Sequence, residues 1–103
     1  MRGMQDMLRQ AQMMQKKMAA IQEELKTREV EATSGGGMVT VKVTGGQEVL
    51  SVTIDKSVVE AGDVEMLQDL VLAAVRDALK KAKTMTEEEM GKITGGMKIP
   101  GMF

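Results

Sequence analysis

Apolar residues in the first quarter of the chain recur at alternating steps of three and four, and this spacing constrains the fold more than any other feature. We call these residues the methionine seam: Met4, Met7, Ala11, Met14, Met18, Ile21 and Leu25. Such spacing places side chains on one narrow stripe of a helix, along which a second helix can pack. No proline, and no glycine after Gly3, interrupts the pattern. We therefore predict a helix from about Gly3 to Leu25 or Lys26.

The apolar period changes to two directly after this helix, in residues 27–33, 38–44 and 48–54. Alternation of this kind is typical of strands with one buried and one solvated face. In the middle segment three valines share one face, and in the third we expect Leu50, Val52 and Ile54 to form the buried face. The glycine-containing connections at 34–37 and 45–46 are too short for a crossover. The sequence therefore predicts a three-stranded antiparallel meander.

A second long helix is predicted from Asp63, a residue type that caps helix N-termini well. Its apolar stripe comprises Leu67, Leu70, Val71, Ala74, Val75, Ala78 and Ala82. Before it, we expect Ser57 to cap a single turn, and near its end we expect Thr86 to restart the helix before Gly91. Residues 95–103 are predicted to be a flexible tail, or to dock on a partner.

These elements predict one α+β domain over residues 1–103. It consists of a helical arm (1–26), a sheet (27–54), a C-terminal helix (63–94) and a tail (95–103). A helix of about 24 residues is about 36 Å long, whereas three strands are only about 15 Å wide. The first helix must therefore overhang the sheet, and its seam needs an apolar cover. The last helix supplies part of that cover, and a C₂ homodimer is the simplest closed arrangement that supplies the rest.

The composition argues against most catalytic chemistry. The chain has no Cys and no His, so thiolate or imidazole metal sites and His-based acid–base catalysis are excluded. We expect no enzyme activity, no cofactor, no metal and no small-molecule substrate. The opening residues MRGMQDMLRQ are too polar for a signal-peptide core, and no apolar run approaches the roughly 18 residues that span a bilayer. We expect a soluble, cytoplasmic protein without a membrane partner.

Charge is distributed unevenly along the chain although the net charge is only −1. Residues 1–28 hold six basic and three acidic side chains, a balance of +3. Arg2, Arg9 and Lys16 are spaced seven apart on the face opposite the seam, and Lys17 broadens their stripe. Repeated cations on an exposed helix suit phosphate contact, but they also suit a simple solvated face.

A second basic cluster lies in the last helix and consists of Arg76, Lys80, Lys81 and Lys83. Three acidic residues, Asp69, Asp77 and Glu87, lie within one or two turns of it. Intrahelical ion pairing and phosphate binding are therefore equally open interpretations of this cluster.

Four segments together resemble the YbaB/EbfC family of small bacterial nucleoid-associated DNA-binding proteins, nearly end to end. They are MQDMLRQAQMMQKKM, TSGGGMVTVKVTGGQEVLSVTID, EMLQDLVLAAVRDALKKAK and GGMKIPGMF. The resemblance implies an α-β-β-β-α subunit and an intertwined homodimer with protruding helical arms. It also implies binding of double-stranded DNA with little or modest sequence preference, a nucleoid location, and roles in chromosome organisation and transcription regulation.

Two other functions remain open at this stage. One is a protein–protein adaptor in which the methionine-rich helix and the apolar tail dock on another protein. The other is an enzyme subunit that borrows its site from a partner, which the lack of a clustered nucleophile and base disfavours.

Overall fold

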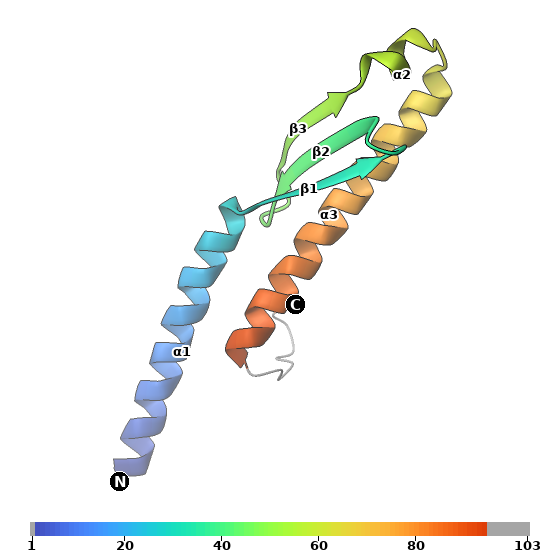
Figure 1. The fold of residues 1–103 in the computed structure, drawn as a ribbon. Coiled ribbons are helices and arrows are strands. Elements are labelled where there is room, and N and C mark those ends of the chain that lie inside the picture. The colour runs from blue at the N-terminus through green and yellow to red at the C-terminus, as the bar shows by residue number, and fades with distance from the viewer. Residues whose placement is uncertain (1, 95–103) are drawn as a thin grey trace.

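The computed structural model describes residues 2–94 and is strongly elongated, with extents of 73 × 20 × 18 Å (Figure 1). Its elements are α1 (Arg2–Thr27), β1 (Glu29–Ser34), β2 (Val39–Thr44), β3 (Val49–Ile54), α2 (Lys56–Glu60) and α3 (Val64–Thr94). The predicted α-β-β-β-α architecture is confirmed, with the short α2 inserted between the sheet and the last helix. The predicted tail, residues 95–103, lies outside the described residues.

The three strands form an antiparallel sheet in the order β1-β2-β3. The central strand β2 is the core of the sheet, because Val39, Val41 and Val43 are completely buried on one face. The β1–β2 turn contains Gly35, Gly36 and Gly37, all at positive φ, which explains the run of three glycines there. In the β2–β3 turn the positive φ lies instead at Gln47.

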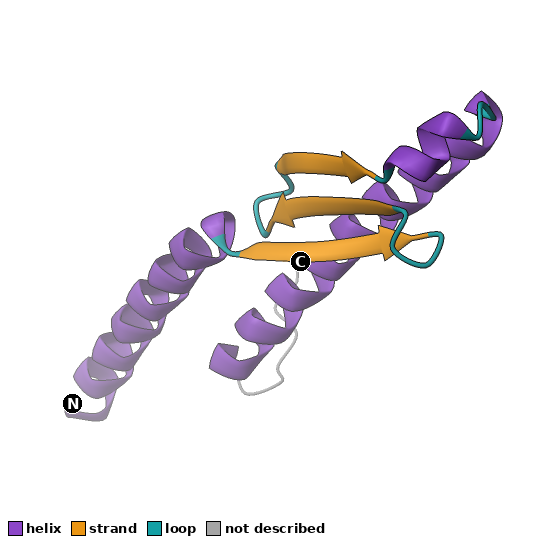
Figure 2. Ribbon diagram, turned by 45° about the horizontal axis from the view of Figure 1, so that its top comes forward, coloured by secondary structure: helices purple, strands orange, loops and turns teal. Residues whose placement is uncertain are grey.

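Helix α3 covers only part of the sheet, and this overturns one expectation. It packs across β1 and β2, whereas β3 lies at the far edge (Figure 2). Val52 and Ile54 pair with the buried Val41 and Val39, so they point to the same face of the sheet. They nevertheless remain 43% and 36% exposed. The predicted buried face of β3 is therefore wrong for the single chain.

Leu50, the third residue of that predicted face, is also exposed. The pairing shifts by one residue between Lys42 and Val43, so that Val43 faces Val49 while Lys42 faces Ser51. Leu50 is therefore the extra residue of a β-bulge, and strict alternation does not apply to it.

Small side chains allow α3 to lie close to the sheet. Ala74, Ala78 and Ala82 are completely buried and pack with the valines of β2. The β1–β2 hairpin is tied to the same helix, because Ser34 Oγ donates a hydrogen bond of 2.6 Å to the Leu70 carbonyl. The predicted apolar stripe of this helix is thus the face that contacts the sheet.

The helix termini differ from the predictions in two places. Asp63 Oδ1 accepts a hydrogen bond from the Met66 amide, as expected of an N-cap. The cap of α2, however, is Asp55 and not Ser57, since the Asp55 side chain accepts from the Ser57 amide. Thr86 does not restart a helix either: α3 is continuous, and Thr86 Oγ1 donates to the Ala82 carbonyl one turn earlier.

Candidate nucleic-acid interface

The C-terminal half of α1 packs against α3 through an apolar cluster. Met18, Leu25 and Met90 are buried there, and Ile21, Met85 and Ile93 pack around them. The methionine seam is therefore covered only in its second half. Met4 and Met7 remain 69% and 70% exposed, so the first half of α1 projects as an arm beyond its contact with α3.

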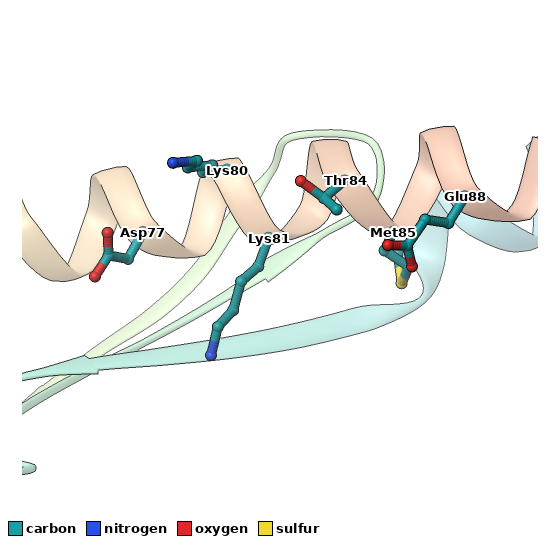
Figure 3. A pocket seen from close by; sticks show the side chains of 6 residues that line it. All are labelled: Asp77, Lys80, Lys81, Thr84, Met85 and Glu88. Atoms are coloured by element: carbon teal, nitrogen blue, oxygen red, sulfur yellow. The ribbon is translucent and has the colours of Figure 1, made fainter.

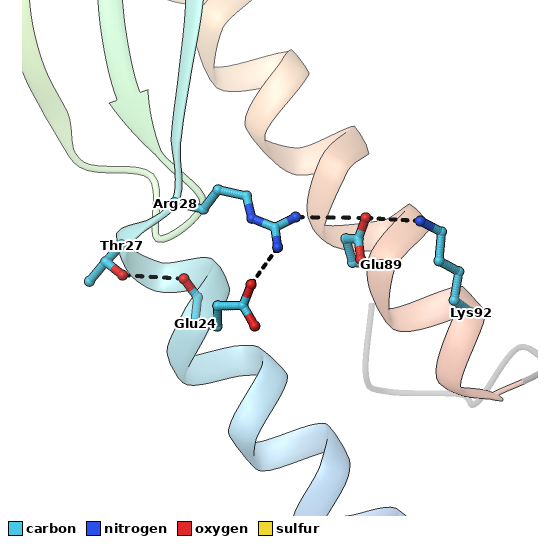
Figure 4. A network of polar contacts seen from close by, with 5 residues as sticks. All are labelled: Glu24, Thr27, Arg28, Glu89 and Lys92. Atoms are coloured by element: carbon cyan, nitrogen blue, oxygen red, sulfur yellow. Dashed lines mark hydrogen bonds and ion pairs between the residues drawn. The ribbon is translucent and has the colours of Figure 1, made fainter.

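A polar network lies on the outside of the same junction (Figure 4). Arg28 forms ion pairs with Glu24 in α1 and, at 3.7 Å, with Glu89 in α3. Glu89 also pairs with Lys92 at 3.1 Å. Pairs this exposed contribute little to stability individually. Of the ion pairs among the described residues, only Arg28–Glu89 joins α3 to the C-terminal end of α1. The sequence offered no signal for the Arg28–Glu89 pair, because its partners are more than 60 residues apart.

A close backbone approach completes the junction. The Gly45 amide donates a hydrogen bond of 3.0 Å to the Arg28 carbonyl. A Cβ at Gly45 would lie 3.0 Å from the carbonyl carbon of Leu25 and 3.1 Å from Met85 Cε, and closer still to the Leu25 carbonyl oxygen. Glycine is therefore required at Gly45 to let the β2–β3 turn contact the end of α1.

The candidate cations of α1 occupy two different environments. Arg9 and Lys16 are exposed, and Lys16 lies with Gln12, Gln15 and Ala19 on the side of α1 away from α3. Lys17 is also exposed, but it lines a groove between α1 and α3 together with Ile21. The side chain of Arg2 lies outside the described part of the chain.

The candidate cations of α3 are likewise divided. Arg76, Lys80 and Lys83 are exposed at positions four and three apart, so they share one face of the helix. Lys81 is directed toward the sheet, where its ammonium group donates a hydrogen bond of 3.2 Å to the Glu31 carbonyl in β1. Figure 3 shows Lys80 and Lys81 pointing to different sides of α3.

None of the seven candidate cations with a described side chain forms an ion pair within residues 3–93. The nearby acidic residues Asp69, Asp77 and Glu87 therefore do not neutralise the second cluster by direct pairing. In α1, by contrast, Glu23 and Glu24 are paired with Lys26 and Arg28. Residues 3–22 then hold three cations against the single carboxylate of Asp6. Residues 3–22 of α1 are therefore net positive, and two of their three cations, Lys16 and Lys17, lie beside the buried Met18.

No group of three or more metal-ligating side chains lies together in the described part of the chain. Between residues 2 and 94, neither long helix is apolar enough to cross a membrane.

Comparison with known proteins identifies the family. The model of the YbaB/EbfC DNA-binding family matches residues 1–97. A nucleoid-associated protein of Alkaliphilus metalliredigens is 54% identical, with 98% of this chain and 89% of the relative covered. One of Syntrophobacter fumaroxidans is 56% identical, with 92% and 86% covered.

The fold also matches a solved structure, that of an uncharacterized protein from Helicobacter pylori. The TM-score is 0.70 at 28% identity, with 82% of this chain and 89% of that chain covered. The family match over residues 1–97, the similarity to the relatives and the shared fold all lead to the same conclusion. The chain belongs to the YbaB/EbfC DNA-binding family.

Proposed function

We propose that this protein is a nucleoid-associated protein that binds double-stranded DNA as a homodimer with little sequence preference. Binding would contribute to chromosome organisation and to the regulation of gene expression. The proposed function is binding alone, with no reaction, cofactor or small-molecule substrate. The family description supports DNA binding, and the names of the relatives support association with the nucleoid.

The observation that supports it most directly is the set of exposed cations on α1 and α3 that have no acidic partner among the described residues. Arg9 and Lys16 are about 10 Å apart along the helix axis. Arg76, Lys80 and Lys83 add a second row. Duplex DNA presents closely spaced phosphates, which rows of this kind neutralise without reading base edges. We place Lys17 at the border of this surface and assign Lys81 a smaller role, because it is engaged with β1.

The homodimer is supported by the uncovered edge of the sheet. Val49, Val52 and Ile54 continue the apolar face that α3 covers over the other two strands. A row of half-exposed β-branched residues beside a completely buried core is typical of a surface that another chain covers. A C₂ arrangement buries the same patch on both subunits.

Duplex binding is tested with charge-reversal variants that change the net charge equally. In the test variant, Arg9→Glu is combined with Lys16→Glu. In the control, Lys42→Glu is combined with Lys56→Glu, both exposed and away from the proposed surface. Fluorescence anisotropy with a labelled duplex should show a much larger loss of affinity for the test variant. Equal losses would mean that only net charge matters, and this would remove the α1 face from the proposal.

Dimerisation is tested by sedimentation equilibrium. Val52→Asp places a carboxylate on the apolar face of β3 and should shift the protein toward a single chain. Ser51→Asp is the matched control, because Ser51 is the next residue and pairs with Lys42 on the polar face. Far-UV circular dichroism should show folded protein in both cases. Identical masses for the two variants would contradict dimerisation through this face.

A further inference from the structure

The uncovered half of the methionine seam ends in a groove between the two long helices. Met13, Met14 and Ile21 line it from α1 and Ile93 lines it from α3, together with the polar side chains of Gln10, Lys17, Glu89 and Lys92. Beyond the groove, the exposed Met7 and Met4 continue the seam toward the start of the chain. An apolar surface therefore begins where α3 ends and runs along α1.

The directions of the two helices place the C-terminal end of α3 beside this surface. Leu25 of α1 lies beside Met85 of α3, because both are close to Gly45. Earlier in α1, Met14 lies beside Ile93, which comes later in α3, since both line the same groove. The two helices are thus antiparallel, and α1 projects past the end of α3 (Figure 1). A segment that leaves α3 in the same direction meets Met14 first, then Met7 and Met4.

The segment that follows α3 has the length and composition to cover the seam. Nine residues, 95–103, follow Thr94. In extended form they reach about 30 Å, twice the roughly 15 Å from Met14 to Met4 along the helix axis. Met97, Ile99, Met102 and Phe103 are apolar, and Lys98 is the only charged side chain. Pro100 prevents a continuous helix through the segment.

We propose that residues 95–103 dock in the groove between α1 and α3 and cover the exposed half of the methionine seam of their own chain. Attachment at the mouth of the groove gives the segment a high effective concentration there, which a separate molecule lacks. Lys16 lies on the other side of α1, and of the proposed DNA-binding cations only Lys17, at the border of that interface, lines the groove. Docking of an apolar segment there needs no bound phosphate. The inference therefore does not depend on DNA binding, and its tests use no DNA.

Disulfide trapping in the full chain tests the proposal, and the absence of native cysteines makes it unambiguous. Met14→Cys with Ile99→Cys should form a bond within one chain at least tenfold faster than Gln12→Cys with Ile99→Cys. Gln12 is two residues away but lies with Lys16 on the other side of α1. Equal rates would overturn the proposal. So would bonds between two chains, detected by mixing tagged and untagged protein, because they would make a second copy the occupant.

A second measurement avoids thiols. The chain has no Trp, so Ile99→Trp introduces a single fluorescent reporter into the segment. Its emission should be blue-shifted relative to free tryptophan, and adding Met14→Asp should move it to longer wavelength. Adding Gln12→Asp should leave it unchanged. A solvent-exposed spectrum in all three proteins would contradict docking.

Discussion

The close approach at Gly45 predicts that one added methyl group weakens the junction between the arm and the sheet. In Gly45→Ala the new Cβ would lie 3.0 Å from the Leu25 carbonyl carbon and closer to its oxygen. Backbone atoms cannot rotate away as a side chain can. The end of α1 must therefore move, and the completely packed Leu25 moves with it.

Two estimates bound the cost of this movement. Overpacking of a well-packed region typically costs about 1–3 kcal/mol. If α1 instead separates from the turn, the exposure of Leu25 alone costs about 1.5–3 kcal/mol. Both estimates place the loss of unfolding free energy near 2 kcal/mol. For a domain of this size, each kcal/mol corresponds to a decrease in Tm of about 4–8 °C.

Urea denaturation followed by far-UV circular dichroism, at a fixed chain concentration, measures the loss. Gly91→Ala is the matched control, because it adds the same methyl group inside α3 with nothing within 4 Å of the new atom. Alanine is the better helix former, so this variant should gain about 0.5–1 kcal/mol. Opposite signs for the two variants are expected. A Gly45→Ala protein as stable as the parent would refute the tight contact between the turn and α1.

Two further predictions concern the sheet and its connection to α3. Ala78→Leu should lower the unfolding free energy by about 1–3 kcal/mol, because Ala78 is completely buried where α3 meets β2. An unchanged urea midpoint would show that α3 lies farther from the sheet. Hydrogen bonds from the Ser57 amide and hydroxyl hold the pKa of Asp55 below its ordinary value of 3.8. The carboxylate form therefore favours the folded state, and its stabilisation of α2 is present above pH 3.8 and lost as the pH falls through the lowered folded pKa. The Ser57 amide resonance should follow this titration, and an Asp55→Asn protein with the same response would contradict the assignment.

The parts of the fold that the sequence predicts well depend on local rules. Alternating valines define β2, since period-two burial needs only a strand with one covered face. The glycines of the first hairpin turn and the Asp63 cap follow from backbone conformation and from unpaired helix amides. Each of these signals lies within a few residues of the structure that it predicts.

The expectations that fail depend on contacts between distant segments. Whether β3 is buried depends on which strands α3 crosses, and the periodicity of Val52 and Ile54 carries no information on that. Asp and Ser are both good N-cap residues, so the sequence alone does not tell whether Asp55 or Ser57 caps α2. The need for glycine at Gly45 arises from Leu25, in another element.

The candidate site shows the same division. Helical spacing alone predicts that Arg9 and Lys16 share a face, and they lie exposed in the structure. The contact of Lys81 with the Glu31 carbonyl and the pairing of Arg28 with Glu89 join elements far apart in the chain. No pattern within one helix indicates either contact.

The salt dependence of duplex binding reports how many phosphates the basic surface neutralises, because each neutralised phosphate contributes about −0.9 to the slope of log affinity against log salt concentration. We expect a slope between about −1.8 per bound chain, from Arg9 and Lys16 alone, and about −4.5 with Arg76, Lys80 and Lys83 included. An adaptor that binds only other proteins would leave the duplex unbound at every salt concentration. A slope near zero, or no binding at low salt, would contradict the proposed basic interface.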